Sequence, residues 1–133
     1  MIGYFDTSAV MPLVIDEPSS GRCAQVWRAC DVRVSSMLVI AEAHAALAMA
    51  LRLGRLSEPQ HAAALDLLAK RIEELDLFLP TREVVDKAGE LALAHALRGY
   101  DAVHAATALA LKSDDLVAVT GDKTLLDAFT ALG

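Results

Sequence analysis

Short apolar runs alternate along the chain with longer segments that carry hydrophobic residues at helical spacing. The runs predict strands at residues 2–5, 32–34, 77–79 and 116–119, because each is a brief hydrophobic stretch bounded by polar residues. The longer segments between them predict helices. Strands that alternate with helices build βαβ units, so the pattern predicts one α/β domain around a mostly parallel sheet.

Helix-capping residues set the expected limits of the helices. Ser35 or Ser36 is expected to cap a long helix that ends before Gly54, and Ser57 and Thr81 are expected to cap the next two. The predicted helices cover residues 9–15, 20–30, 37–53, 58–75, 82–98, 101–112 and 123–129.

The most apolar of these helices begins at Asp101 and carries no charge from Ala102 to Leu111. We expect Gly99 to end the preceding helix and Asp101 to cap this one, since Gly favours helix C-termini and Asp favours N-caps. A helix that is apolar all round belongs inside a domain. With no Lys or Arg beside it on that helix, the Asp101 carboxylate is either only a cap or is held for chemistry.

Length and composition are those of a single domain with its own core. The chain has 133 residues, of which 55% are hydrophobic. Its charge-free runs are too short to span a bilayer, and Asp6 comes too early for a signal peptide. Cys23 and Cys30 form neither a disulfide framework nor a zinc motif, so we expect two small buried residues. These features predict a reduced, cytoplasmic protein.

The formal net charge of −6 argues against nucleic-acid binding, which depends on Lys and Arg. It agrees with nucleic-acid binding only if several acids are committed to a divalent cation. The positions of the acids therefore decide more than their number.

Four acids are candidates for such a site. Asp6 and Asp122 each follow a predicted strand, and the carboxyl ends of parallel strands share one edge of the sheet. Asp101 stands at a helix entry, and Glu42 lies in an apolar helix with no base within helical reach. Each Asp alone could be a helix cap, and Glu42 could be exposed.

Together these acids would repel one another. At an effective dielectric of about 20 and a separation of about 5 Å, each carboxylate pair repels by roughly 3 kcal/mol. A bound cation would offset that repulsion. Oxygen-rich sites of this kind suit Mg²⁺ or Mn²⁺.

The motifs around these acids resemble those of the PIN-domain nucleases, and most closely the VapC-type toxins of prokaryotic type II toxin–antitoxin pairs. The matching segments are Asp6-Thr7-Ser8, Glu42 in its apolar helix, Tyr100-Asp101-Ala102 followed by His104, and Thr120-Gly121-Asp122. The resemblance runs through residues 1–133. It implies a single PIN-like three-layer domain, with a short, mostly parallel sheet of about four to five strands and helices on both faces. The family commonly adds a short strand after the last helix, and here Gly133 follows that helix closely.

The resemblance also implies a function. It implies an Mg²⁺- or Mn²⁺-dependent endoribonuclease that cuts tRNA or rRNA with a metal-activated water. The implied metal ligands and catalytic residues are Asp6, Glu42, Asp101 and Asp122, oriented by Thr7, Ser8 and Thr120. Whether one or two ions bind, and which carboxylate assists the water, stay open.

Partners are implied in the same way. The resemblance implies a homodimer and a cognate antitoxin whose Arg enters the carboxylate cluster, and the apolar helices at residues 37–53 and 83–97 agree with association. By contrast, His104 shares a helix face with Asp101, and we expect it to be a packing residue. We expect Tyr100 to pack against the sheet.

Two alternatives remain at this point. A phosphatase of the haloacid-dehalogenase type also has an Asp after its first strand, and Gly121-Asp122 with Asp127 loosely resembles its last acidic motif. That family needs a second acid where Ser8 stands, however. The other alternative is a PIN-like module that binds a partner without catalysis.

Overall fold

The fold is built on one four-stranded parallel sheet. The computed structural model describes residues 1–133. The strands are β1 (Ile2–Phe5), β2 (Val32–Ser36), β3 (Asp76–Phe78) and β4 (Leu116–Val119), in the spatial order β3-β2-β1-β4. All neighbouring strands are parallel, and Ile2 pairs with Val32 on one side and Leu116 on the other. The predicted α/β class and parallel sheet are confirmed, with four strands.

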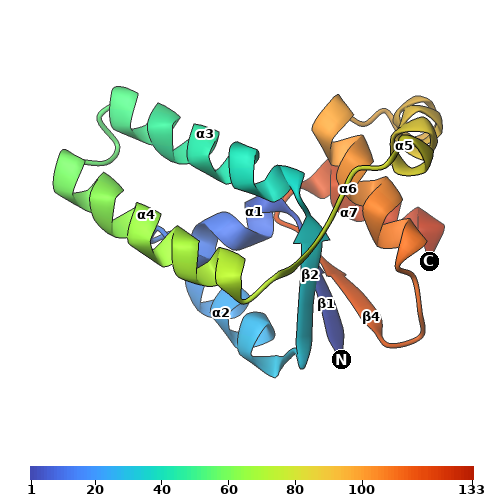
Figure 1. The fold of residues 1–133 in the computed structure, drawn as a ribbon, viewed down its shortest axis with the longest axis horizontal. Helices are drawn as coiled ribbons and strands as arrows, with labels where there is room; N and C mark the ends of the chain where they lie inside the picture. The colour runs from blue at the N-terminus through green and yellow to red at the C-terminus, as the bar shows by residue number, and fades with distance from the viewer.

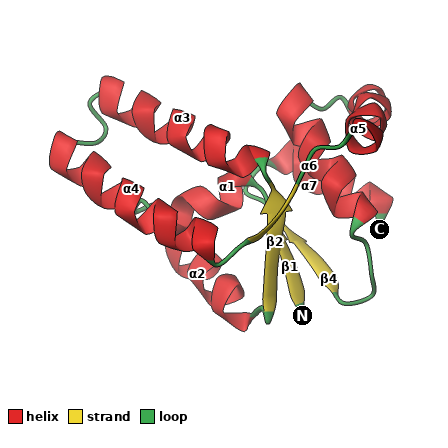
Figure 2. Cartoon of the chain, in the orientation of Figure 1, coloured by secondary structure: helices red, strands yellow, loops and turns green.

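Helices cover both faces of the sheet. They are α1 (Thr7–Val10) with a 3₁₀ turn (Met11–Leu13), α2 (Ser20–Ala29), α3 (Leu38–Arg52), α4 (Glu58–Glu73), α5 (Arg82–His95), α6 (Gly99–Ala110) and α7 (Lys123–Leu132). Figure 1 shows α1 to α4 on one side of the strands and α5 to α7 on the other. Coloured by secondary structure, the same view shows the sheet as a middle layer (Figure 2). No helix has the length and apolarity needed to cross a membrane.

Adjacent residues of β1 pack into separate cores, because side chains alternate between the two faces of a strand. Phe5 packs with Trp27, Leu47 and other residues of α1 to α4. Tyr4 points the other way, with Val34 and Ala108. Both aromatic side chains are fully buried, so β1 is anchored from two sides and the residue after it is held in place.

The junction before α6 differs from the prediction. Helix α5 ends at His95, where Ala96 adopts the left-handed conformation with φ 52° that we had expected a Gly to supply. Helix α6 already begins at Gly99 and takes Arg98, in extended conformation, as its N-cap residue. The expectation that Asp101 caps this helix is therefore wrong. Asp101 lies inside the first turn, and its carboxylate is not used by a helix end.

Two smaller predictions also need correction. Ser35 and Ser36 belong to β2 and are fully buried, and Met37 is the N-cap residue of α3. Ser36 Oγ still accepts a hydrogen bond from Leu38 N at 3.2 Å, so the helix-start signal was real but displaced by one residue. Tyr100 does not pack against the sheet, since 61% of it is exposed.

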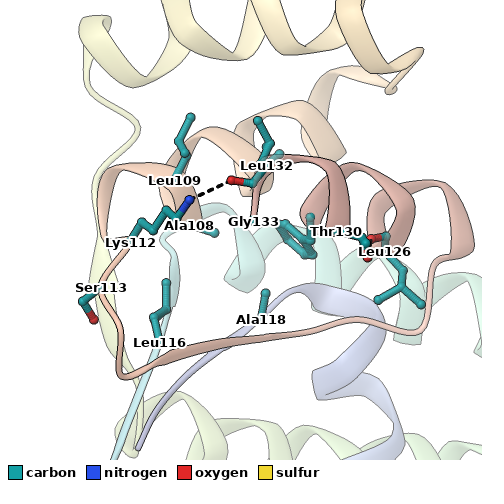
Figure 3. A pocket seen from close by; sticks show the side chains of 12 residues that line it. Ala108, Leu109, Lys112, Ser113, Leu116, Ala118, Leu126, Thr130, Leu132 and Gly133 are labelled. Carbon is teal, nitrogen blue, oxygen red and sulfur yellow. Dashed lines mark hydrogen bonds between the residues drawn. The ribbon is translucent and has the colours of Figure 1, made fainter.

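A small apolar hollow lies between α6, α7 and the start of β4. Its volume is about 230 Å³, and its lining includes Leu109, Leu116 and Phe129. Lys112 Nζ closes one side by donating to the Leu132 carbonyl oxygen at 2.8 Å (Figure 3). None of the four candidate acids lies in it.

Candidate functional site

All four candidate acids line one pocket beyond the carboxyl ends of β1 and β4. The pocket has a volume of about 220 Å³. It is lined by Asp6, Thr7, Ser8, Met11, Glu42, Arg98, Asp101, His104 and Asp122. Strand order reverses between β1 and β4, and open α/β sheets bind ligands at such a switch point. Segments up to 116 residues apart in sequence thus supply one concave acidic surface.

Asp6 is the most deeply buried of these acids, with 2% of its surface exposed. Its carboxylate accepts hydrogen bonds from Ser8 Oγ at 2.8 Å, from Thr120 Oγ1 at 2.7 Å and from Ala9 N at 3.1 Å. Burial raises the pKa of the Asp6 carboxyl above its ordinary value, while the hydroxyl donors act in the opposite direction. No Lys or Arg pairs with it. Asp6 is therefore a preorganised carboxylate whose charge is not neutralised by a neighbouring base.

Ser8 and Thr120 also link the segments that follow β1 and the edge strand β4. Ser8 Oγ lies 3.1 Å from Thr120 Oγ1 and accepts a hydrogen bond from Gly121 N at 2.7 Å. Thr120 Oγ1 accepts from Asp122 N at 3.1 Å. Two of the three hydroxyls predicted to orient the site thus contact Asp6 directly and link it to the segment that carries Asp122.

Glu42 is held by a chain of buried polar groups. His104 Nε2 lies 2.6 Å from Glu42 Oε1, and Thr7 Oγ1 donates to the same oxygen at 2.9 Å. On the other side of the ring, Tyr4 Oη lies 2.7 Å from His104 Nδ1. Burial raises the pKa of Tyr4, so its hydroxyl remains a hydrogen-bond donor. Both side-chain hydrogen bonds of Glu42 end on Oε1, which leaves Oε2 free to bind a ligand.

His104 was expected to be a packing residue, and that interpretation is incomplete. It is 1% exposed and packs edge-on against Tyr4, but both of its ring nitrogens are hydrogen-bonded within the site. The signal in the sequence that His104 belongs to the site was its position three residues after Asp101 on the same helix. The contact with Glu42 was not visible in sequence, because 62 residues separate the two.

Asp101 and Asp122 share a cationic neighbour. Arg98 Nε lies 3.1 Å from Asp101 Oδ2, and Arg98 Nη2 lies 3.7 Å from Asp122 Oδ2. Asp122 also caps α7 by accepting from Leu125 N at 2.9 Å. The expectation that no base stands beside Asp101 is therefore wrong. Arg98 precedes Asp101 by three residues, which is contact spacing once α6 begins at Gly99.

The donor chemistry of this pocket fits a hard divalent cation. Four carboxylates and three hydroxyls offer oxygen ligands of the kind that Mg²⁺ and Mn²⁺ prefer. In the present arrangement no three acidic, imidazole or thiol side chains stand close enough together to hold an ion. Two of the carboxylates are turned toward Arg98 and one toward His104 instead. These side chains already line one pocket, and metal binding would require them to move closer together.

Comparison with known proteins decides the family. A model of the PIN domain matches residues 3–129. The chain belongs to the PIN-domain family. Curated relatives narrow this to the VapC ribonucleases. Over 136 aligned residues the chain is 41% identical to ribonuclease VapC45 of Mycobacterium tuberculosis (strain CDC 1551 / Oshkosh), covering 98% of this chain and 90% of the relative. It is 36% identical to ribonuclease VapC46 of Mycobacterium tuberculosis (strain ATCC 25618 / H37Rv), covering 98% and 92%.

Solved structures show the same PIN fold. The structure of PAE2754 from Pyrobaculum aerophilum superposes with a TM-score of 0.73 at 27% identity, covering 96% of this chain and 79% of the other. VapC20 of Mycobacterium tuberculosis, described as a sarcin-ricin loop cleaving toxin, superposes with a TM-score of 0.72 at 21% identity, covering 98% and 95%. This PIN domain is thus a ribonuclease of the VapC type, and the phosphatase alternative loses its basis.

Proposed function

We propose that this PIN domain is a toxin endoribonuclease that uses Mg²⁺ or Mn²⁺ to hydrolyse RNA phosphodiester bonds. The proposed metal ligands and catalytic residues are Asp6, Glu42, Asp101 and Asp122. The observation that carries the proposal is the convergence of these carboxylates in one pocket at the switch point of the sheet. When bound, the divalent cation supplies a water of lowered pKa and positive charge for the scissile phosphate.

The protein's own groups prepare this pocket. Ser8 and Thr120 fix both oxygens of Asp6 through hydroxyl donors. His104 and Thr7 hold Oε1 of Glu42, so that its other oxygen is presented in a fixed direction. Outer hydrogen bonds of this kind orient ligating carboxylates in metal sites. The assigned role of Thr7, Ser8 and Thr120 is therefore to position carboxylates rather than to react.

Cleavage of a labelled tRNA or rRNA fragment tests the proposal. We expect cleavage with Mg²⁺ or Mn²⁺, none in EDTA, and loss of activity to the EDTA level in Asp6→Asn and Asp101→Asn. Asp86→Asn is a matched control, because Asp86 also pairs with an Arg but lies on α5, outside the pocket. Full cleavage in EDTA, or by Asp6→Asn, would refute the metal assignment. A wild-type protein that binds Mn²⁺ yet cuts no RNA would favour the non-catalytic alternative.

We also propose a cytoplasmic homodimer restrained by a cognate antitoxin, with an Arg of the antitoxin entering the carboxylate pocket. The excess of acids over bases in the pocket supports an incoming cation. A structural neighbour with a TM-score of 0.66 and 16% identity, covering 96% of this chain and 93% of the other, is VapBC2 from Rickettsia felis bound to a DNA fragment from its promoter. If a stoichiometric complex with the antitoxin kept full nuclease activity, this mode of inhibition would be wrong.

Exposed apolar side chains on α3, at its C-cap position and on α5 support the dimer. Met49, Leu53, Val85 and Leu93 are 54%, 60%, 45% and 90% exposed. Burying such side chains against a second copy would stabilise association through the hydrophobic effect. Sedimentation equilibrium of Leu93→Glu should show a shift toward monomer relative to the wild type, and an unchanged mass would exclude α5 from the interface.

A further inference from the structure

Arg98 stands at the mouth of the acidic pocket and reaches two acids that come from different elements. It occupies the N-cap position of α6, while Asp122 caps α7. Its side chain is 82% exposed, whereas those of Asp101 and Asp122 are 18% and 30% exposed. One guanidinium thus approaches from solvent and contacts the Oδ2 atoms of two partly buried carboxylates.

Arg98 is also the only Lys or Arg among the residues that line the pocket. The nearby carboxylates of Asp101, and then of Asp122 and Glu42, raise the pKa of the guanidinium, so it stays charged under all ordinary conditions. Its positive charge offsets part of the repulsion among the acids. A divalent cation held by the same carboxylates would do the same.

We propose that Arg98 is a built-in counter-ion that competes with the divalent cation for Asp101 and Asp122 and, once displaced, binds a phosphate of the RNA. The inference rests on the proposed metal-dependent function. Two positive charges beside the same oxygens repel each other, so cation binding weakens both ion pairs of Arg98.

The displaced Arg98 side chain is then placed to bind an RNA phosphate. Arg98 is joined to Asp101 through only Gly99 and Tyr100, so its guanidinium stays at the rim of the pocket after release. Its high exposure means that little packing holds it in its present position. A guanidinium binds phosphate oxygens through two parallel hydrogen bonds. RNA that reaches the acids therefore passes the Arg98 guanidinium, which the bound metal ion has displaced from Asp101 and Asp122.

Mn²⁺ binding measured by titration calorimetry tests the competition without relying on catalysis. Exposed ion pairs are weak, so Arg98→Gln should bind Mn²⁺ about two- to fivefold more tightly than the wild type. Arg82→Gln is the matched control. Arg82 is 89% exposed and pairs with Asp86 at 3.0 Å, away from the pocket. The Arg82→Gln substitution removes the same charge as Arg98→Gln and should leave Mn²⁺ affinity unchanged.

Arg98→Lys separates direct contact from the general effect of charge. Lysine keeps the charge but lacks the planar fork that joins two carboxylates. If direct contact matters, this variant should bind Mn²⁺ with an affinity between those of the wild type and Arg98→Gln. Wild-type affinity in both Arg98 variants would overturn the competition, and wild-type affinity in Arg98→Lys alone would overturn the part assigned to direct guanidinium contact.

The phosphate contact is tested at saturating metal. Arg98→Gln should raise the KM for RNA severalfold with little change in kcat, whereas Arg82→Gln should change neither. An unchanged KM in Arg98→Gln would refute the phosphate contact. Failure of this inference is distinct from failure of the proposed function: in the second case the wild type itself binds no Mn²⁺ at the pocket, and Asp6→Asn changes nothing.

Discussion

Tyr4→Phe tests the buried polar chain that holds Glu42. The substitution removes one oxygen from a fully buried side chain and leaves the ring in place between His104 and Phe129, whose ring centroids lie 5.9 and 6.4 Å from that of Tyr4. No cavity of side-chain size forms. The substitution removes the 2.7 Å hydrogen bond to His104 Nδ1.

The expected magnitude follows from what remains. His104 is 1% exposed, so water does not replace the missing hydroxyl, and Nδ1 is left without a partner. An unsatisfied buried polar atom costs about 1–3 kcal/mol. We therefore expect the free energy of unfolding to fall by about 1–3 kcal/mol. Because the ring of His104 is less restrained, Mn²⁺ affinity should also fall by about tenfold, the lower end of the effect of losing an outer hydrogen bond in a metal site.

Urea unfolding followed by circular dichroism measures the first quantity, and an unchanged m-value would show that the same surface is exposed on unfolding. Leu68→Ala is a useful control, since Leu68 is 1% exposed and lies on α4, outside the pocket, so that its truncation should destabilise the fold without altering Mn²⁺ affinity. A fall in the free energy of unfolding of less than about 0.5 kcal/mol in Tyr4→Phe would refute the reasoning, because it would mean that no buried polar atom is left unsatisfied.

Three further predictions concern other parts of the chain. Asp6→Asn should raise the melting temperature of the metal-free protein at pH 7, because the variant buries no carboxylate charge. Because burial raises the pKa of Asp6 in the folded state, wild-type stability falls as the pH rises from the ordinary carboxyl range through the raised pKa. In EDTA, the difference in melting temperature between Asp6→Asn and the wild type should therefore shrink toward pH 4. Gly3→Ala should destabilise by about 1–3 kcal/mol in urea unfolding, since its Cβ would lie 2.5 Å from Cys30 Sγ and 2.6 Å from the Phe5 ring; wild-type stability would contradict this close packing. Ser57→Ala should cost about 1 kcal/mol in thermal unfolding, because it removes the acceptor of the Gln60 N–H in a capping box, and a loss near zero would mean that the end of α4 frays.

The sheet was predictable from sequence because its strands are short apolar runs at the ends of which polar residues recur. Asp6 and Asp122 both follow such runs, and parallel pairing alone brings them to one edge. Glu42 was a candidate because it lies in an apolar helix with no base within helical reach, and its role as a metal ligand came from the family resemblance. The hydrogen-bond partners of Glu42 were not predicted. His104 reaches Glu42 across 62 residues through the packing of α6 against the sheet, which no local pattern encodes.

The region before α6 shows a different limit. Capping preferences favoured Gly99 as the end of α5, yet Ala96 takes the left-handed conformation there. Residues other than Gly pay a steric penalty in that conformation, so sequence preferences predict the helix end at Gly99 rather than at Ala96. The shift of two residues in the start of α6 changed the chemistry of the site, because it made Arg98 a neighbour of Asp101 and removed Asp101 from its expected capping role.

The order of strands has a consequence for biosynthesis. β1 is made first but receives β4, its second neighbour, only when residues 116–119 emerge, and Asp6 gains Thr120 at the same moment. Until then the ribosome holds a nascent chain with an unpaired strand edge and an incomplete set of acids. Such distant pairings form slowly during folding. A growing polypeptide of this kind lacks Thr120 and Asp122, and so lacks a complete pocket, until its last strand has been made.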